Sequence, residues 1–437
     1  MNTTDPRAII AREPMHSRQV IAIAVATALN ALDGFDVLSI SFAAPGIAKD
    51  WGIDRAALGL VLSMELIGMG IGAFFLGAMA DRIGRRPTIL ACLVIMASGM
   101  FLASVAPDVT VLSAFRLFTG LGIGGMLAAT NAIVAECSNA RRRNLSVAIM
   151  AGGYPMGAIV GGIIATLALD ATGRWQAVFE FGALITALFI PLVLWLVPET
   201  IAFLLHKRPA GALDKINRTM VRQGRAPLAE LPPRDEAPTR FSFGAFFAPG
   251  IAGVTLLLIL AYFSHMMTFY FLVKWIPKIV VDMGFPPASA GGVLVWANVG
   301  GASGSIVLSL LTQKIGVRPL VIGAMICGAI GVTVFGQGFT TLASLSVIAC
   351  IGGFFTNAAT AGLYAVIAQS FPASLRAGGT GLVIGIGRAG AAMGPIMAGL
   401  LFASGTPLAV VAIIMGCGTL VGGIALSLVR YRESAIA

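Results

Sequence analysis

The stretch GAMADRIGRRP (residues 77–87) returns in altered form as SLLTQKIGVRP (residues 309–319). Each stretch directly follows a long apolar run. The matching pairs are Arg82 with Lys314, Gly84 with Gly316, Arg86 with Arg318 and Pro87 with Pro319, and Gln313 stands opposite Asp81. A second echo pairs ECSNARRRN (136–144) with QSFPASLRA (369–377). These echoes predict a chain built from two similar halves.

The composition places both halves in a membrane. Of the 437 residues, 57% are hydrophobic and 11% are charged, whereas a soluble domain carries about 25% charged residues. A transmembrane helix needs about 20 mostly apolar residues, and twelve such runs occur. We place them at about 19–44, 56–80, 87–106, 109–135, 145–169, 176–197, 250–274, 288–312, 318–338, 341–368, 378–403 and 407–429.

The positive charges predict the orientation of these spans, because lysine and arginine concentrate in cytoplasmic loops. With both termini inside, the cytoplasmic segments carry 22 of the 29 basic residues, the outer segments carry five, and Arg116 and Arg388 lie within helices. The net charge of +10 therefore follows membrane topology and does not indicate a nucleic-acid partner.

The fold class we predict is an all-α membrane protein of twelve transmembrane helices in two six-helix bundles. The expected divisions are a cytoplasmic tail (1–18), an amino-terminal bundle (19–197), a cytoplasmic linker (198–249), a carboxy-terminal bundle (250–429) and a cytoplasmic tail (430–437). Repeated halves are typical of transporters that bind substrate between the halves, near the middle of the bilayer. We expect the protein to work as a monomer in the lipid bilayer.

Several motifs carry a family resemblance. GAMADRIGRRP resembles the loop signature of the major facilitator superfamily, and the resemblance covers essentially the whole chain. Five further stretches resemble the aromatic acid:proton symporter family, namely DGFD, FRLFTGLGIGG, VPET, KWIP and LRAGGTGLVIGIGRAGAAMGP. The resemblance implies a bacterial inner-membrane importer of hydroxybenzoate-like anions that is driven by the proton gradient. Some members of that family carry non-aromatic diacids such as muconate.

The chain departs from the family pattern at four positions. Gln313 replaces an acidic residue that is common in the second-half loop, which weakens the expectation of a symmetric gate. Lys274 precedes the W-x-P motif where a neutral residue is more usual, and Glu65 and His265 match no family marker. Glu65 and His265 suggest a distinct substrate.

Two carboxylates, Asp33 and Asp36, interrupt the first apolar run in LDGFDV (32–37). They are three residues apart and so share a helix face. An aspartate at the centre of a membrane helix costs roughly 2.5–3.5 kcal/mol, and burial with mutual repulsion favours a protonated form. We predict that this pair carries the coupling proton, although Asp36 near the outer end could instead be hydrated or act as a cap. Glu65 is a second titrating group or a partner for a cavity arginine.

Two arginines are candidates for binding a substrate carboxylate, since a guanidinium can donate paired hydrogen bonds to it. Arg388 lies ten residues inside the eleventh span (378–403), where snorkelling to the surface is difficult. Arg116 in helix 4 has the alternatives of pairing with an aspartate of helix 1 or snorkelling. In the second half, His265, Tyr270, Lys274 and Trp296 are candidates for lining the cavity, with core packing or an interfacial position as the alternatives.

A cytoplasmic gate is predicted around the loop after helix 2. Asp81 can accept hydrogen bonds from the start of the fourth or the eleventh span, or can pair with an arginine such as Arg142. Such a latch would close in the outward-open state and release in the inward-open state. The full set of predicted gate residues is Asp81, Arg82, Arg85, Arg86, Glu136, Arg142 and Arg376.

Other classes of function find little support. The three histidines are scattered and no phosphate-binding G-x-x-x-x-G-K-[ST] motif occurs, so we expect no enzyme, no metal and no cofactor, with the proton gradient as the energy source. The alternatives are symport of a non-aromatic carboxylate, and a drug exporter. In drug antiporters glycine precedes proline in helix 5, whereas here Pro155 precedes Gly157. A sensor or scaffold would need an interaction module, and the short tails and the linker offer no evident one.

Overall fold

The structure is a computed structural model that describes residues 5–233, 243–249, 251–372 and 375–429. Within these residues twelve helical spans are long and apolar enough to cross a membrane, which confirms the predicted number. The first six are α2 (Ser17–Trp51), α3 (Arg55–Ile83), α4 (Arg85–Ser104), α5 (Val109–Cys137), α6 (Arg143–Thr172) and α7 (Gln176–Leu196). The second six are α10 (Ala252–Asp282), α11 (Pro287–Leu311), α12 (Val317–Phe335), α13 (Leu342–Gln369), α14 (Arg376–Gly387) with α15 (Ala389–Ala403), and α16 (Leu408–Leu428).

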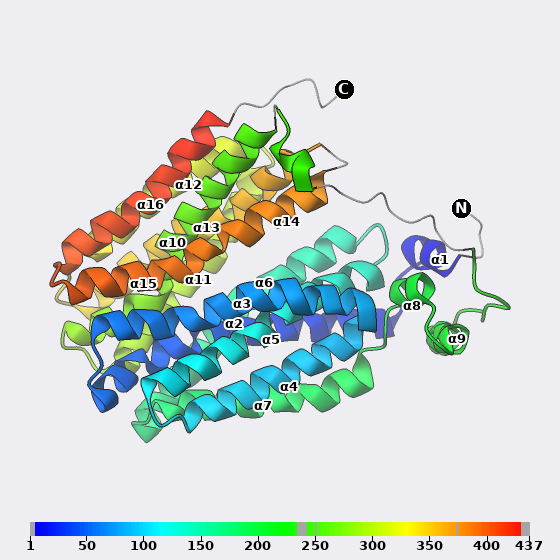
Figure 1. The fold of residues 1–437 in the computed structure, drawn as a ribbon, viewed down its shortest axis with the longest axis horizontal. Helices are drawn as coiled ribbons and strands as arrows, with labels where there is room; N and C mark the ends of the chain where they lie inside the picture. The colour runs from blue at the N-terminus through cyan, green and yellow to red at the C-terminus, as the bar shows by residue number, and fades with distance from the viewer. Residues whose placement is uncertain (1–4, 234–242, 250, 373–374, 430–437) are drawn as a thin grey trace.

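The two sets of six helices form two halves that lie side by side along the length of the molecule (Figure 1). In the amino-terminal half α3 packs on α5, and α4 packs on α5 and α7. In the carboxy-terminal half α11 packs on α13, and α12 packs on α13 and α16. These helices occupy equivalent places in the two halves, so the repeat seen in the loop sequences is also a repeat of packing.

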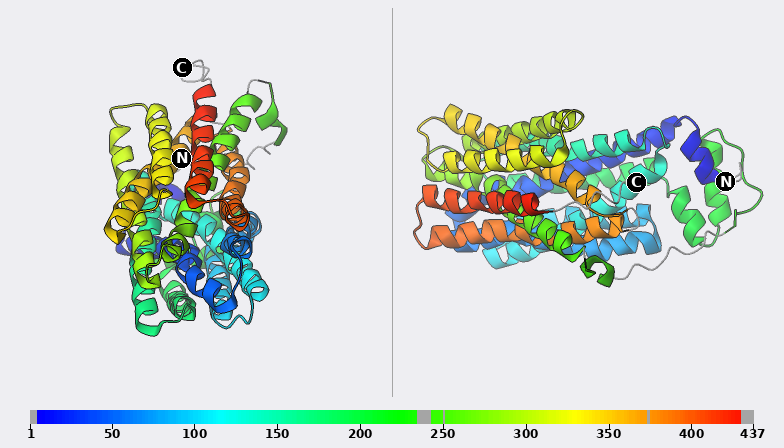
Figure 2. Two further views of the ribbon diagram at one scale, coloured as in Figure 1. Left: turned by 90° about the vertical axis from the view of Figure 1, so that its left-hand side faces the viewer. Right: turned by 90° about the horizontal axis from the view of Figure 1, so that it is seen from above.

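The halves join at one end of the molecule, which we call the distal face and which lies opposite the terminal face carrying α1, α8 and α9 (Figure 1). Near the distal face the Ser63 hydroxyl donates to the backbone oxygen of Ala392 (2.7 Å), and Arg55 pairs with Asp282 (3.0 Å). Gly59 packs so closely on Pro395 that a Cβ would lie 2.5 Å from its backbone oxygen. The ribbons of the halves diverge toward the terminal face (Figures 1 and 2). In this conformation the two halves therefore contact each other at the distal face and diverge toward the terminal face.

Two helices continue beyond their predicted ends. The first span was expected to stop at residue 44 and the seventh at residue 274, but α2 reaches Trp51 and α10 reaches Asp282. Each contains a proline near the expected end, Pro45 and Pro277. Proline usually breaks a soluble helix, whereas membrane helices tolerate it because their neighbours satisfy the freed backbone groups.

The amino-terminal tail and the linker were predicted as separate segments, and in the structure they pack together. The short helices α1 (Pro6–Arg12), α8 (Ile201–Lys207) and α9 (Ala212–Arg222) share a small apolar core that includes Ile10, Leu204 and Ile216. The linker also contains the 3-10 helix η1 (Phe243–Phe247). The predicted carboxy-terminal tail, 430–437, lies outside the described residues.

Candidate functional site

Five charged side chains meet inside the membrane-spanning region, and we call them the charged cluster. They are Asp33 and Asp36 of α2, Glu65 of α3, Arg116 of α5 and Lys274 of α10. Each is 2% exposed or less. Four come from the amino-terminal half, and Lys274 comes from the carboxy-terminal half, so the cluster joins the two halves.

Glu65 is the centre of this cluster. Its two carboxylate oxygens face different cations, with Oε1 paired to Arg116 and Oε2 at 3.4 Å from Lys274 Nζ. One acid therefore serves two buried cations, one from each half. Glu65 thus pairs with an arginine, which is one of the two roles expected of it, and its role as a titrating group stays a prediction.

One predicted alternative for Arg116 was an ion pair with an aspartate of the first span. The structure contradicts it, because Arg116 does not pair with a carboxylate of α2. Its guanidinium donates to the backbone oxygen of Asp36 (3.0 Å), contacts the sulfur of Met100 (2.9 Å) and lies 5.2 Å from the ring centre of Phe179. Snorkelling is also wrong, since the side chain is fully buried. The contact with Phe179 has the geometry of a cation–π interaction.

Lys274 was predicted as a cavity residue or an interfacial residue, and the structure excludes the interface because α10 continues for two further turns beyond it. Its ammonium also donates to the backbone oxygen of Val37 on α2. Lys274 thereby ties α10 to both α2 and α3. Removing an ammonium from water costs several kcal/mol unless partners compensate, and here Glu65 and Val37 are those partners.

The carboxylates of Asp33 and Asp36 are buried, and none of their four oxygens has a hydrogen-bond partner among the described residues. A buried carboxylate without a partner is costly as an anion, so in this conformation both groups are suited to holding a proton. Gly34 between them lets α2 lie directly on α6, because a Cβ there would lie 2.0 Å from the backbone oxygen of Tyr154. The DGFD motif thus joins two protonatable groups to a close helix contact.

A second group, which we call the tyrosine cluster, surrounds Arg388. Its members are Tyr154 of α6, Tyr262 and Tyr270 of α10, and Tyr364 of α13, which are four of the five tyrosines in the chain. Arg388 lies near Tyr262, Tyr270 and Tyr364, and the hydroxyl of Tyr364 lies 3.1 Å from that of Tyr262. Tyr270 and Tyr154 lie near each other across the boundary between the halves.

The tyrosine cluster is less enclosed than the charged cluster. Tyr364 is 39% exposed, and Arg388, Tyr154 and Tyr270 are partly exposed. Arg388 stands at the junction of α14 and α15, where the predicted single helix 11 is divided in two. A guanidinium beside several phenols can bind a carboxylate through paired hydrogen bonds and can stack an aromatic ring nearby.

Two predicted cavity residues join neither cluster. His265 is fully buried within the carboxy-terminal half, where Nδ1 lies 2.7 Å from the hydroxyl of Thr419 and Nε2 lies 3.0 Å from the backbone oxygen of Thr356. Both ring nitrogens are occupied, so His265 connects α10, α13 and α16 as a packing residue. The side chain of Trp296 is 53% exposed on α11 and makes no described contact with either cluster.

Three of the predicted gate residues form a network at the terminal face of the amino-terminal half. Asp81 pairs with Arg85 (3.2 Å), which also pairs with Glu136 (2.8 Å). Asp81 thus pairs with an arginine, as one of its expected alternatives has it, but the arginine is Arg85 and not Arg142. Glu199 instead accepts the backbone N–H groups of Arg85 (3.0 Å) and Arg86 (3.2 Å) at the start of α4.

The rest of the predicted gate is exposed. Arg82, Arg142 and Arg376 have exposed side chains, and none forms an ion pair within the described part of the chain. Arg376 begins α14, which packs on α10, α13 and α15 of its own half. A gate that is released at the terminal face agrees with the divergence of the halves there.

Sequence reasoning missed Glu199 and three of the four tyrosines. Glu199 belongs to the VPET stretch, directly after α7, and its spacing alone does not point to α4. Tyr154, Tyr262 and Tyr364 carried one usable signal, which is the rarity of tyrosine in this chain. Within the described residues, no three His, Cys, Asp or Glu side chains gather as a metal site requires.

Two repeated bundles joined at one face, with ionisable groups buried between them, define a secondary transporter. Comparison with known families agrees. The sequence profile of the Major Facilitator Superfamily matches residues 26–301 and 258–436, and the chain belongs to that superfamily. It is thus a transporter and not an enzyme, and a multi-pass protein of the bacterial inner membrane.

Curated relatives cover nearly the whole chain. The chain is 29% identical to a 3-(3-hydroxy-phenyl)propionate transporter of Escherichia coli, over 96% of each protein. It is 29% identical to a gallate transporter of Pseudomonas putida, over 93% of the chain and 91% of that protein. It is 28% identical to a 4-hydroxybenzoate transporter of the same species, over 89% of the chain and 88% of that protein.

Solved structures agree in fold. A crystal structure of the D-xylose-proton symporter matches with a TM-score of 0.70 at 18% identity, over 93% of this chain and 97% of that one. An inward-open structure of the xylose transporter XylE from E. coli matches with a TM-score of 0.69 at 17% identity, over 94% of this chain and 97% of that one.

Proposed function

We propose that this protein is a proton-coupled importer of aromatic carboxylates of the hydroxybenzoate type. One observation carries the proposal: Arg388 lies among four tyrosines contributed by both halves, in a partly exposed cluster. The guanidinium suits a carboxylate, and the phenols suit an aromatic ring and its hydroxyl groups. The names of the relatives support the same class of substrate, since they specify hydroxylated aromatic acids.

The charged cluster supports the coupling to protons. Asp33 and Asp36 are buried and without hydrogen-bond partners in the described structure, so they can take up a proton when the distal face opens. Loss of that proton leaves a buried carboxylate close to the Glu65–Arg116 pair. We infer that protonation of the charged cluster permits the two halves to exchange the contacts between them, while Arg388 holds the organic anion.

The gate network supports alternating access. Asp81, Arg85 and Glu136 are paired within the amino-terminal half, and Arg376 of the other half is exposed. In the opposite conformation the terminal ends of the halves come together, and we propose that Asp81 then exchanges its partner. Import requires that the terminal face is cytoplasmic, as the distribution of lysine and arginine predicts.

Uptake into proteoliposomes tests the proposal. Purified protein is reconstituted, and labelled 4-hydroxybenzoate is supplied with and without an inward proton gradient. The expected result is accumulation above equilibrium that needs the gradient and is blocked by unlabelled benzoates. Uptake of an aliphatic diacid alone would replace the substrate class but keep the mechanism, and the absence of any gradient effect would contradict proton coupling.

A further inference from the structure

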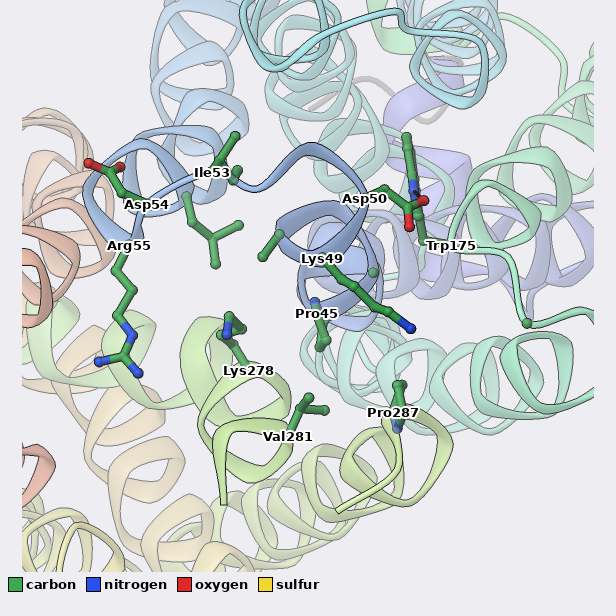
Figure 3. Close-up of a pocket in the computed structure, with 14 residues that line it drawn as sticks. Pro45, Lys49, Asp50, Ile53, Asp54, Arg55, Trp175, Lys278, Val281 and Pro287 are labelled. Atoms are coloured by element: carbon green, nitrogen blue, oxygen red, sulfur yellow. Dashed lines mark hydrogen bonds between the residues drawn. The ribbon is translucent and has the colours of Figure 1, made fainter. Parts of the chain in front are cut away.

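A cavity of about 450 Å³ lies between the two halves at the distal face (Figure 3). Its walls come from the end of α2, the start of α3, the loop before α7, the end of α10 and the start of α11. The cavity is separate from both clusters, because none of its lining residues belongs to either of them. Three cations line it, namely Lys49, Arg55 and Lys278.

The two carboxylates that line the cavity each accept a hydrogen bond from a neutral donor. Asp50 accepts a hydrogen bond from the indole N–H of Trp175 (2.8 Å). Asp54 caps α3 by accepting from the backbone N–H of Ala57 (2.7 Å). Figure 3 shows Asp50 directed toward Trp175, away from the ammonium of Lys49. These hydrogen bonds hold the two acids at the cavity wall, and neither acid forms an ion pair with a lining cation within the described residues.

The three lining cations differ in their ion pairs. Arg55 (at 3.0 Å) and Lys278 both pair with Asp282, so one carboxylate serves two cations. Lys49 forms no ion pair with any described residue, and its side chain extends into the cavity in Figure 3. Lys49 is thus the lining cation without a paired carboxylate among the described residues.

Apolar side chains form the rest of the wall. Pro45, Val281 and Pro287 lie around Lys49 in Figure 3. Trp175 is held in place by Asp50 and by an edge-on contact with Trp51, whose ring centre is 5.3 Å away. A rigid apolar wall beside a free ammonium suits a flat anion, with its carboxylate on the lysine and its ring on the wall.

We propose that this cavity is an outer binding site for an aromatic carboxylate, with Lys49 as its cation. The site captures the anion at the distal face before the halves part there. When they part, Arg55 loses Asp282 of the other half and becomes a second free cation at the entrance. The identity of the anion and the direction of capture rest on the proposed function.

A cysteine placed in the wall reports on the site directly. Ile53→Cys is made in a chain whose five native cysteines are replaced by alanine, and the protein is studied in nanodiscs, where reagents reach both faces. The rates of labelling by an anionic and by a cationic methanethiosulfonate are compared. The anionic reagent should react faster, and Lys49→Gln should lower the ratio of the two rates by about fivefold at low salt.

A matched control is Lys215→Gln, which removes an exposed lysine of α9 at the terminal face and should leave the ratio unchanged. Unlabelled 4-hydroxybenzoate should slow labelling of Ile53→Cys, and it should do so equally when Arg388→Gln removes the proposed transport site. A ratio that Lys49→Gln does not alter overturns the proposal. So does protection that disappears with Arg388→Gln, because the central site would then be its cause.

Protection that persists in a protein without gradient-driven uptake would keep the outer site and contradict the proposed function. Gradient-driven uptake without protection would keep the proposed function and contradict the outer site. The two proposals can therefore fail separately.

Discussion

The two loops that repeat along the chain share one contact and differ in another. Arg86 donates to the backbone oxygen of Leu194 at the end of α7, and Arg318 donates to those of Leu426 (2.9 Å) and Ser427 (2.7 Å) at the end of α16. Since α7 and α16 are equivalent helices, the repeat preserves an arginine that caps the last turn of the final helix. This shared contact stabilises each half by itself.

The network around Arg85 has no counterpart in the second loop. Val317 and Gln313 stand where the first loop has Arg85 and Asp81, so the ion pairs of the gate are confined to the amino-terminal half. The same asymmetry holds inside the membrane, because Asp282 is the one acidic residue in the sequence from 250 to 429. What both halves keep is structural, and the acids that we propose for proton coupling belong to one half.

The largest effect is expected from removing the acid at the centre of the charged cluster. Glu65→Gln leaves Arg116 and Lys274 buried without a counter-charge, and breaking a buried pair in this way costs about 3–5 kcal/mol. Thermal unfolding in nanodiscs should show severe destabilisation. Adding Lys274→Met should restore part of the loss.

Asp282→Asn is the matched control from the other half, since Asp282 also serves two cations but is partly exposed. Exposed pairs contribute about 0–1 kcal/mol, so this variant should remain close to the parent. Equal losses from Glu65→Gln and Asp282→Asn would contradict the division of roles between the halves.

Asp33→Asn and Arg388→Gln are expected to impair different steps of transport. Asp33→Asn should abolish accumulation driven by the proton gradient but keep exchange of labelled for unlabelled substrate. Arg388→Gln should weaken both, with a KM raised about 10- to 100-fold, because hydrogen bonds to charged groups contribute about 1.5–3 kcal/mol. Gradient-driven accumulation by Asp33→Asn would exclude this aspartate as the coupling group.

A smaller and symmetric effect is expected at the shared arginines. Arg86→Gln and Arg318→Gln each remove hydrogen bonds to helix-end carbonyls and should each lower stability by about 1 kcal/mol. Arg85→Val, which copies the second loop, should instead change the rate of transport. The measurements are thermal unfolding and initial uptake rates. A transport defect in Arg318→Gln as large as that in Arg85→Val would place a gate in both halves.

The smallest effect concerns pH. Burial raises the pKa of the Glu199 carboxyl above its ordinary value of 4.5, against the backbone hydrogen bonds from Thr200, Arg85 and Arg86. The folded state therefore binds the proton more tightly than the unfolded state, and stability falls as pH rises from 4.5 through the raised pKa. Glu199→Gln should remove that part of the slope in unfolding measured against pH. A parallel slope in the variant would assign the pH dependence to other groups.

The sequence predicted the two halves and the twelve spans, because each leaves a local pattern of hydropathy or repetition. It failed at the ends of α2 and α10, where Pro45 and Pro277 lie inside continuous helices. That error had a consequence for the site. A helix ending at residue 274 places Lys274 at the membrane surface, whereas the longer α10 buries it against Glu65.

Hydropathy and loop charges depend on residues that are neighbours in the chain, so the sequence alone determined the class of fold and the share of ionisable groups in each half. The partners of those groups depend on helix rotation and on which helices face one another. Only the tertiary structure decided that Glu65, rather than Asp33 or Asp36, receives Arg116, and that four tyrosines from three helices meet at Arg388. The physical reason is that the spacing along one helix specifies a face, while packing between helices specifies what that face meets.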